Sequence, residues 1–495
     1  MRNKIVYWCF LCFFFLGLAI FYSYKLTQIP TGINIDESSI GYNANLIART
    51  LRDENNRFLP AFFLTLEGKD WKQPVRVYST AILFKLFGAS YFGLRFVSVM
   101  FALVSCFVFY QILRLLLPEN LSFIGLLLFV SSPSLLIQSH LALENIDLLP
   151  FILAWLYFLF SWTLQPKNSK LVLAGILLGL SFYSYKGMRA AVPVYMGLSL
   201  LYFGYWVFIK KVGSIKSIAW FLFGIAPFLL PIKWLQLHYA GAIYDPAVVS
   251  MPSFHDALIN YLSSFDFSFL FGKGDKMLVH STGRQGMFLA PSLILFFLGI
   301  IQMAKEKKPW FYLAFFALVF TPVLFGSVNS VYRASRLMPY IPFATIIFTL
   351  GVKKILEVKT KVLKYLAVGF FVFSLIFSYI DFVKCYFGEY PKWISGDFSP
   401  DFNSAVGQLA VIASRGNKRA YFDKNDFLAH RSDLEFFREV YFPQGVGLWT
   451  REKENFPENG LVLTSVDGTG DLQSYREVPA LHSGQKTLFI VGRKK

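Results

Sequence analysis

IVYWCFLCFFFLGLAIFYSYKL, residues 5–26, is a nearly continuous apolar stretch that follows a short basic start. A helix of about 20 apolar residues is long enough to cross the hydrocarbon core of a bilayer. A cleaved signal peptide usually has a shorter apolar region and a small-residue cleavage site, so we predict a retained membrane span here. The whole chain has the composition of a membrane protein, because 55% of its 495 residues are hydrophobic and 19% are aromatic.

Ten further apolar runs follow the first one along the chain. Together they predict eleven spans, and therefore a mainly α-helical bundle that crosses the membrane many times. The ten ranges are 91–115, 119–138, 147–165, 170–185, 189–209, 217–237, 287–304, 309–327, 338–353 and 364–383.

The distribution of Lys and Arg predicts which side of the membrane each connection faces. With the N-terminus inside, the inner connections carry sixteen basic residues, whereas the three short outer loops carry four. This bias indicates a cytoplasmic N-terminus and puts the segments 27–90, 238–286 and the tail from about 386 on the outer side. The net charge of +18 is mostly an inner-face feature, so nucleic acid is not an expected partner.

Two stretches of the first outer segment have apolar residues at helical spacing. They are residues 40–51 and residues 77–87, which end just before Gly88. Both predict amphipathic helices that lie along the outer membrane surface.

The chain changes character near residue 386. Residues 386–495 have mixed charge and frequent Gly and Pro, and they contain no apolar run long enough to cross a bilayer. We predict a helix at 403–413 and strands at 461–464 and 487–491, and hence a small α/β domain on the outer face. The chain then divides into a membrane domain, 1–385, and this soluble domain. The four cysteines imply no disulfide framework.

The stretch INIDESSIGY, residues 33–42, brings an Asp–Glu pair directly after the first span. Carboxylates beside a span are costly unless they face water, a cation or a substrate. One carboxylate of the pair, Asp36 or Glu37, could act as a general base toward an acceptor hydroxyl or amine, with the other orienting the acceptor. Alternatively, Asp36 could cap the helix that begins there. The pair by itself leaves both interpretations open.

Positive charge is the second feature of the outer face. The short outer loops carry only four basic residues, namely Lys186, Arg189, Arg333 and Arg336. Guanidinium groups suit phosphate oxygens, so a lipid-linked phosphate is a natural ligand for these residues. The alternative is that each side chain reaches toward lipid headgroups from a helix end.

Two further polar stretches face the same side. His140 and Glu144 are four residues apart, a spacing that would put them on one helix face to bind a metal or a sugar. His280 lies in the Gly-punctuated loop 274–286, which could be a lid, an acceptor contact or a plain connection.

The sequence contains no Gly-Lys-Ser/Thr phosphate loop, no dinucleotide fingerprint and no Asp-X-Asp triplet. A transferase with its site on the outer face would therefore need a donor other than a nucleotide sugar. A polyprenyl-phosphate sugar meets this need, because its tail dissolves between spans and its phosphate can reach the outer arginines.

The order of these fragments resembles the GT-C superfamily, and in particular the membrane glycosyltransferases related to protein O-mannosyltransferases and lipid A aminoarabinose transferases (glycosyltransferase family 39-like). The acid pair followed by Gly41-Tyr42 is similar to the acidic motif in the first loop of that family. The other matching fragments are Gln73-Pro74 with Tyr78, Gly93-Leu94-Arg95 with Ser98, Ser132-Pro133 leading to Glu144, Ser181 to Tyr185 with Arg189 and Pro193, Gly274-Asp275 with His280 to Thr282 and Gly286, and Arg336 with Pro339 and Pro342.

The resemblance implies an inverting glycosyltransferase that moves a sugar from a polyprenyl-phosphate donor to an acceptor protein, lipid or glycan. It implies Asp36 as the base, assisted by Glu37, and Arg336 near the donor phosphate. Tyr42 and Arg95 join His140, Glu144 and His280 as expected substrate-binding residues. We expect no certain cofactor, and the need for a divalent metal is left open.

Two other functions remain as alternatives, a transporter or flippase and a ligase of the O-antigen type, both of which would handle a polyprenyl-linked glycan. The expected location is the plasma membrane, with the C-terminal domain on its outer face.

Overall fold

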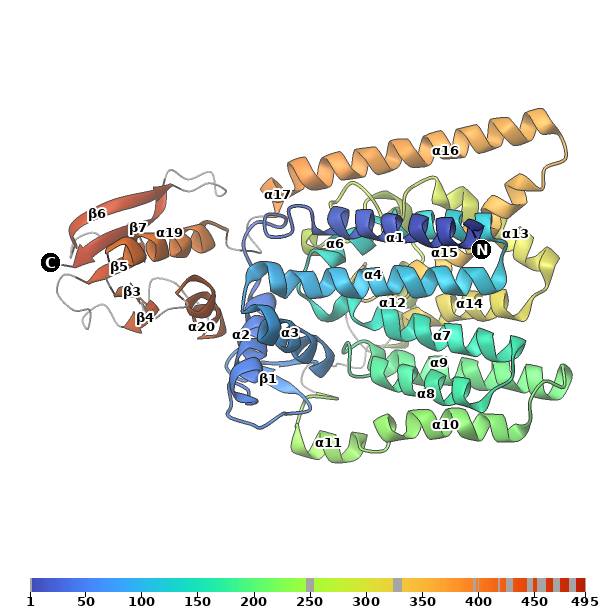
Figure 1. Ribbon diagram of the computed structural model, residues 1–495, viewed down its shortest axis with the longest axis horizontal. Helices are drawn as coiled ribbons and strands as arrows, with labels where there is room; N and C mark the ends of the chain where they lie inside the picture. Colours follow the sequence, from blue (N-terminus) through green and yellow to red (C-terminus); the bar gives the residue numbers. More distant parts are fainter. Residues whose placement is uncertain are drawn as a thin grey trace. The chain divides into compact units, whose positions relative to one another are not determined.

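The computed structural model is mainly helical and ends in a small mixed sheet (Figure 1). The chain forms two compact units, Met1–Tyr24 with Ser98–Tyr386, and Lys25–Val97 with Phe387–Lys495. The residues described are 2–245, 253–323, 332–394, 398, 400–416, 419–423, 431–442, 448–451, 460–465, 472–479 and 487–494.

The first unit is built from helices. In order they are α1 (Arg2–Ser23), α4 (Tyr91–Leu116, whose first residues belong to the second unit), α5 (Glu119–Val130), α6 (Pro133–Ser139), η1 (Glu144–Ile146), α7 (Leu148–Leu164), α8 (Asn168–Ser181), α9 (Met188–Gly204), η2 (Tyr205–Ile209), α10 (Ile215–Leu229), α11 (Ile232–His238), α12 (Phe254–Ser263), η3 (Ser268–Gly272), η4 (Leu278–His280), α13 (Ser292–Glu306), α14 (Pro309–Phe320), α15 (Tyr340–Leu356), α16 (Lys361–Lys384) and η6 (Cys385–Glu389, which runs into the second unit).

Every predicted span contains a helix, which confirms a mainly helical, polytopic membrane fold. The sequence predicts eleven spans, which is more than the number of helices that are long enough to cross a membrane. Within the described residues, six helices are long and apolar enough to cross a membrane, and a seventh is obtained if the α5–α6 pair, bent by 60°, counts as one span. The difference arises because four of the apolar runs fold as helices of only 12 to 17 residues, namely α8, α13, α14 and α15.

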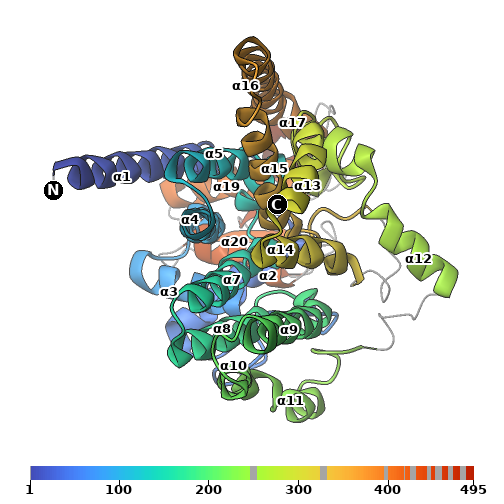
Figure 2. The same cartoon turned by 90° about the vertical axis from the view of Figure 1, so that its right-hand side faces the viewer.

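Glycines let two pairs of these helices approach very closely. α8 lies beside α10, and α13 lies beside α15 (Figure 2). A Cβ added at Gly299 of α13 would collide with the carbonyl oxygen of Ile347, and one added at Gly351 of α15 would collide with that of Leu295. Small residues at such reciprocal contacts are the usual means by which membrane helices pack backbone to backbone.

Gly299→Ala is therefore expected to lower the stability of the first unit by about 1–3 kcal/mol, because the added methyl group must push α13 away from α15. The midpoint of thermal unfolding in detergent measures this change. Gly369→Ala on α16 is the matched control, because its Cβ would meet nothing within 4 Å. An unfolding midpoint that is equally unaffected in both variants would contradict the prediction.

The second unit joins the first predicted loop to the C-terminal region. Its elements are α2 (Ile35–Thr50), β1 (Phe63–Thr65), β2 (Asp70–Lys72), α3 (Pro74–Phe87), α17 (Tyr390–Trp393), α19 (Pro400–Gly416), β3 (Ala420–Asp423), α20 (Arg431–Tyr441), β4 (Leu448–Arg451), β5 (Leu461–Ser465), β6 (Leu472–Pro479) and β7 (Thr487–Lys494). One boundary between the two units follows Tyr386, close to the domain boundary predicted at residue 385. Residues 25–97, however, belong to the same unit as the C-terminal residues and not to the unit that holds most of the helices.

The C-terminal sheet has five strands in the order β4-β3-β5-β7-β6. β3 pairs in parallel with β4 and β5, whereas β7 runs antiparallel to both of its neighbours. The predicted helix at 403–413 and strands at 461–464 and 487–491 lie within α19, β5 and β7. The helix predicted at 40–51 coincides with the later part of α2 and extends one residue past its end, and the helix predicted at 77–87 lies within α3. Both begin earlier than predicted, and their position on the membrane surface stays a prediction.

Candidate active site

Helix α2 begins inside the acidic stretch and is capped by Asn34. The Asn34 side-chain oxygen accepts a hydrogen bond from the backbone N–H of Asp36 at 2.9 Å, and Glu37 Oε2 accepts one from the Asn34 N–H at 3.0 Å. This is a capping box. The alternative that Asp36 itself caps the helix is therefore wrong, because the helix starts at Ile35 and the Asn34 side chain supplies the cap.

Glu37 is fully buried and forms an ion pair with Arg95. Arg95 Nε donates to Glu37 Oε1 at 3.0 Å and Arg95 Nη2 donates to Oε2 at 2.9 Å, which is a two-pronged arrangement. The Arg95 side chain is only 3% exposed. The same guanidinium donates to the carbonyl oxygens of Leu26, Pro30 and Gly32 at 2.7–3.1 Å. The pair thus fixes the segment that connects the first span to α2.

Asp36, next in sequence to Glu37, has a different environment. Its side chain is 44% exposed, and its Oδ1 accepts a hydrogen bond from Lys72 Nζ at 2.5 Å. Lys72 is itself 5% exposed and also contacts Asp70 Oδ2 at 2.6 Å. A buried ammonium thus fixes one oxygen of an otherwise accessible carboxylate, an arrangement that suits a general base.

Lys72 was not among the predicted site residues. It comes from a hairpin of two three-residue strands, in which β1 and β2 pair antiparallel and Phe63 lies opposite Lys72. Strands this short carry no readable alternation of polar and apolar residues. One feature of the sequence could have drawn attention to Lys72. It directly precedes Gln73-Pro74, where α3 begins.

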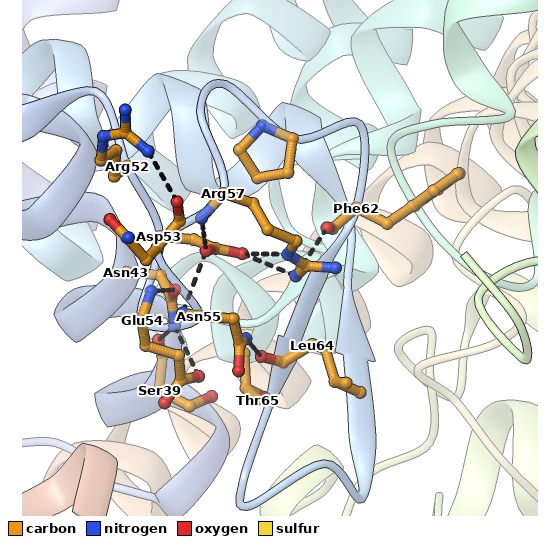
Figure 3. Close-up of polar contacts among 12 residues, drawn as sticks. Ser39, Asn43, Arg52, Asp53, Glu54, Asn55, Arg57, Phe62, Leu64 and Thr65 are labelled. Carbon is orange, nitrogen blue, oxygen red and sulfur yellow. Dashed lines mark hydrogen bonds and ion pairs between the residues drawn. The ribbon is translucent and has the colours of Figure 1, made fainter. Parts of the chain in front are cut away.

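A network of polar contacts holds this hairpin against α2 (Figure 3). Buried Asp53 binds Arg57 through both Nε at 2.8 Å and Nη2 at 2.6 Å. Arg57 also donates to the carbonyl oxygen of Phe62, and Asn55 donates to that of Leu64 in β1 at 2.7 Å. The Arg57 guanidinium lies 5.3 Å from the centre of the ring of Trp71, the residue that precedes Lys72 in the chain. We call Asp53, Asn55 and Arg57, with their contacts to the hairpin, the Asp53–Arg57 brace.

The brace is anchored on α2 by one amide side chain. Asn43 Nδ2 donates to Glu54 Oε1 and Asn43 Oδ1 accepts from the Glu54 N–H, both at 3.1 Å (Figure 3). Tyr42, predicted to bind substrate, is the neighbouring residue on α2 and is buried.

A second group of polar residues lies within the first unit, around the turn that precedes α15. This turn carries Arg333 and Arg336, and the Arg336 N–H donates to the Arg333 carbonyl oxygen at 3.1 Å. Asp275 holds the turn by accepting a 2.7 Å hydrogen bond from the Ala334 N–H, and its other oxygen accepts from the Met277 N–H at 2.9 Å. Burial raises the pKa of Asp275, against the opposing influence of these two N–H groups and of both arginines.

Tyr185 brings the turn between α8 and α9 into the same group. Burial raises its pKa to about 12, although a hydrogen bond and the positive charge of Arg336 act in the opposite direction, and the charge of Glu144 adds to the rise. Tyr185 therefore interacts with both Arg336 and Glu144. Arg189, near the start of α9, donates from Nη1 to the Ile243 carbonyl oxygen at 2.9 Å, and Lys186 lies between Tyr185 and Arg189 in sequence.

His140 and Glu144 do not share a helix face as predicted. His140 ends α6, and Glu144 begins the separate η1 helix, because the chain turns at Leu141 to Leu143. The His140 ring packs edge-on against Tyr386 at 5.4 Å. Among the residues that the structure describes, no group of three or more His, Cys, Asp or Glu side chains could hold a metal ion.

His280 belongs to a buried chain of polar side chains in the same unit. Its Nδ1 lies 2.9 Å from Gln138 Nε2, and Gln138 Oε1 accepts a hydrogen bond from Asn145 Nδ2 at 3.3 Å. Neither Gln138 nor Asn145 was among the predicted residues. Their position around the Ser132-Pro133 turn and η1 is the only sequence feature that connects them with His140 and Glu144.

Part of the chain matches a family model, and its fold is similar to that of solved structures. Residues 72–234 match the family model described as dolichyl-phosphate-mannose-protein mannosyltransferase. No curated protein matches the sequence. The fold is similar to that of ArnT from Cupriavidus metallidurans bound to undecaprenyl phosphate, with a TM-score of 0.58 and 12% identity over 97% of both chains. The apo state of that protein gives a TM-score of 0.59 and 12% identity over 99% of this chain and 98% of that chain. An oligosaccharyltransferase from Archaeoglobus fulgidus in its apo form has a TM-score of 0.46 and 12% identity over 89% of this chain and 65% of that chain.

Proposed function

We propose that the protein is a membrane glycosyltransferase of the mannosyltransferase family, whose model residues 72–234 match. In this proposal it transfers a sugar from a polyprenyl-phosphate donor with inversion at the anomeric carbon. The acceptor is a hydroxyl or amine of a protein, lipid or glycan. The likeness to ArnT bound to undecaprenyl phosphate supports the donor class.

The observation that carries this proposal is the contrast between two adjacent carboxylates. Glu37 is buried against Arg95, whereas Asp36 is 44% exposed and, among the described residues, its carboxylate is bonded through Oδ1 to Lys72. Asp36 is thus the carboxylate of the pair that an acceptor can reach. In the proposed step Asp36 takes the acceptor proton as the acceptor atom attacks the anomeric carbon. The bond between that carbon and the phosphate oxygen breaks, and its electron pair leaves with polyprenyl phosphate.

The departing phosphate needs positive charge in a site with little water. Arg336 is the best candidate, with Arg333 in the same turn, because Asp275 holds the backbone between them in place. Guanidinium forks bind phosphate oxygens in pairs, so a fixed turn that carries two of them suits this task. Lys186 and Arg189 remain candidates for the same phosphate.

Location and topology complete the proposal. The bias of Lys and Arg supports a plasma-membrane protein with a cytoplasmic N-terminus and the acid stretch outside. The short helices α8, α13, α14 and α15 would then complete the eleven predicted spans. Neither Asp36 nor Arg336 requires a metal in this scheme.

The test is a transfer assay with purified protein in nanodiscs and a small panel of polyprenyl-phosphate sugars. Wild-type protein is expected to release polyprenyl phosphate.

Arg336→Ala is expected to weaken donor binding by about ten- to a hundredfold, because each hydrogen bond between charged groups contributes about 1.5–3 kcal/mol. Arg114→Ala is the control, because Arg114 contacts only Tyr7, Tyr110 and Glu119 among the described residues. A donor that binds without transfer would favour the transport alternative, and unchanged donor affinity in Arg336→Ala would remove the phosphate role.

A further inference from the structure

The C-terminal domain contacts helix α2 through a glycine. Gly41, five residues after Asp36, faces the Phe436 ring of α20. A Cβ at Gly41 would meet three atoms of that ring, with Cδ2 at 2.7 Å, Cζ at 2.8 Å and Cε2 closer still. Contacts below 3.0 Å require a neighbour to move, so only glycine permits this approach of α20 to α2.

The Phe436 ring has little room to move aside. It is fully buried, and the Tyr91 ring packs edge-on against it at 5.5 Å. Tyr91 is itself fixed, because its hydroxyl and that of Tyr441 both donate to Asn403 Oδ1 at 2.8 Å. An added methyl group at Gly41 would therefore displace α20 rather than one flexible side chain.

A second contact reaches the acid stretch itself. The Ile33 N–H, one residue before the Asn34 cap, donates to the Phe398 carbonyl oxygen at 2.9 Å. The Phe398 ring is fully buried and lies 5.9 Å from the Arg95 guanidinium, which holds Glu37. The C-terminal segment thus supports both the entry to α2 and the partner of its buried carboxylate.

A third contact lies at the far end of the same helix. Arg49 Nη1 donates to Glu439 Oε2 of α20 at 2.8 Å. The Arg49 side chain is largely exposed, so this ion pair adds little stability.

We infer that the C-terminal domain is a positioning element for Asp36, with Phe436 and Phe398 as its positioning residues. The inference rests on the proposed role of Asp36 as a base. α20 and Phe398 hold the first turns of α2, so they fix where the Asp36 carboxylate points. Misplacement of a catalytic group by about 1 Å can lower turnover by about a hundredfold without changing substrate affinity.

The experiment uses the full-length protein and four variants. Gly41→Ala is expected to lower kcat for sugar transfer by about ten- to a hundredfold, with KM for the donor unchanged. Gly41→Ala combined with Phe436→Leu makes room for the methyl group, and its kcat is expected to return to that of Phe436→Leu alone. Gly197→Ala on α9, where a Cβ would meet nothing within 4 Å, controls for glycine replacement in a helix.

A second readout separates this inference from the proposed function. Hydrogen exchange of the Ile33 and Asp36 amides, which donate to Phe398 and Asn34, is expected to become faster in Gly41→Ala and to recover in the double variant. If wild-type protein transfers no sugar but the exchange pattern holds, the proposed function fails and the coupling stands. If Gly41→Ala exchanges and turns over like wild type, or if the double variant recovers neither property, the inference is overturned.

Discussion

Asp36→Asn is expected to lower kcat for sugar transfer by about 10²- to 10⁴-fold, the contribution of a positioned general base. The amide has nearly the same shape as the carboxylate, and its oxygen can still accept from Lys72, so the local structure should persist. It cannot take a proton from the acceptor. Donor affinity is expected to stay within about threefold, because the proposed phosphate ligands lie elsewhere in the chain. Single-turnover assays together with donor-binding titrations measure the two quantities separately.

Asp70→Asn is the matched control for this variant. Asp70 contacts the same Lys72 ammonium at 2.6 Å, but no proton transfer is assigned to it. It is expected to keep turnover within about tenfold of wild type, the effect of a changed charge beside the site. Equal turnover by Asp36→Asn and wild type would show that the carboxylate is not the base.

Arg95→Ala is expected to destabilise the second unit by about 3–5 kcal/mol, because it leaves the Glu37 charge buried without its partner. The same change removes the hydrogen bonds that Arg95 donates to the carbonyl oxygens of Leu26, Pro30 and Gly32. The midpoint of thermal unfolding, followed through hydrogen exchange of residues 25–97, reports the loss. Arg52→Ala is the control, because Arg52 is exposed and donates to the carbonyl oxygen of Asn56, four residues further along the same loop.

A double-variant cycle tests whether the loss comes from the pair itself. Glu37→Met combined with Arg95→Met removes both charges, and it is expected to cost less than the sum of the single changes. Strictly additive costs would mean that the two side chains do not interact in the folded protein. Glu37 also accepts from the Asn34 N–H, so the single Glu37→Met variant includes the loss of half the capping box.

The sequence predicts the helices better than it predicts the residues around the site. Long apolar runs identify α1, α4, α7 and α16 because each contains enough apolar residues to be recognised without tertiary information. The same reasoning counts α8, α13, α14 and α15 as spans although they are shorter, because apolar residues that flank a helix extend the run.

The acid pair could be found from the sequence, but the separate environments of its two members could not. The helix starts two residues earlier than a cap at Asp36 would require, so Asn34 is the cap, and helix ends are the least certain part of any sequence-based assignment. The partner of Glu37 is 58 positions away and that of Asp36 is 36 positions away. No periodicity links residues at those distances, so only the folded chain reveals them.

The Asp53–Arg57 brace has a consequence for the energetics of catalysis. The hairpin that carries Lys72 is held by contacts within the chain, from Asn43 on α2 through Arg57 to the Trp71 ring. Ordering a mobile loop would otherwise consume binding energy from the substrate. In the proposed reaction the Lys72–Asp36 pair belongs to a preorganised frame, so more of the binding energy of the proposed donor and acceptor would remain available to lower the activation barrier.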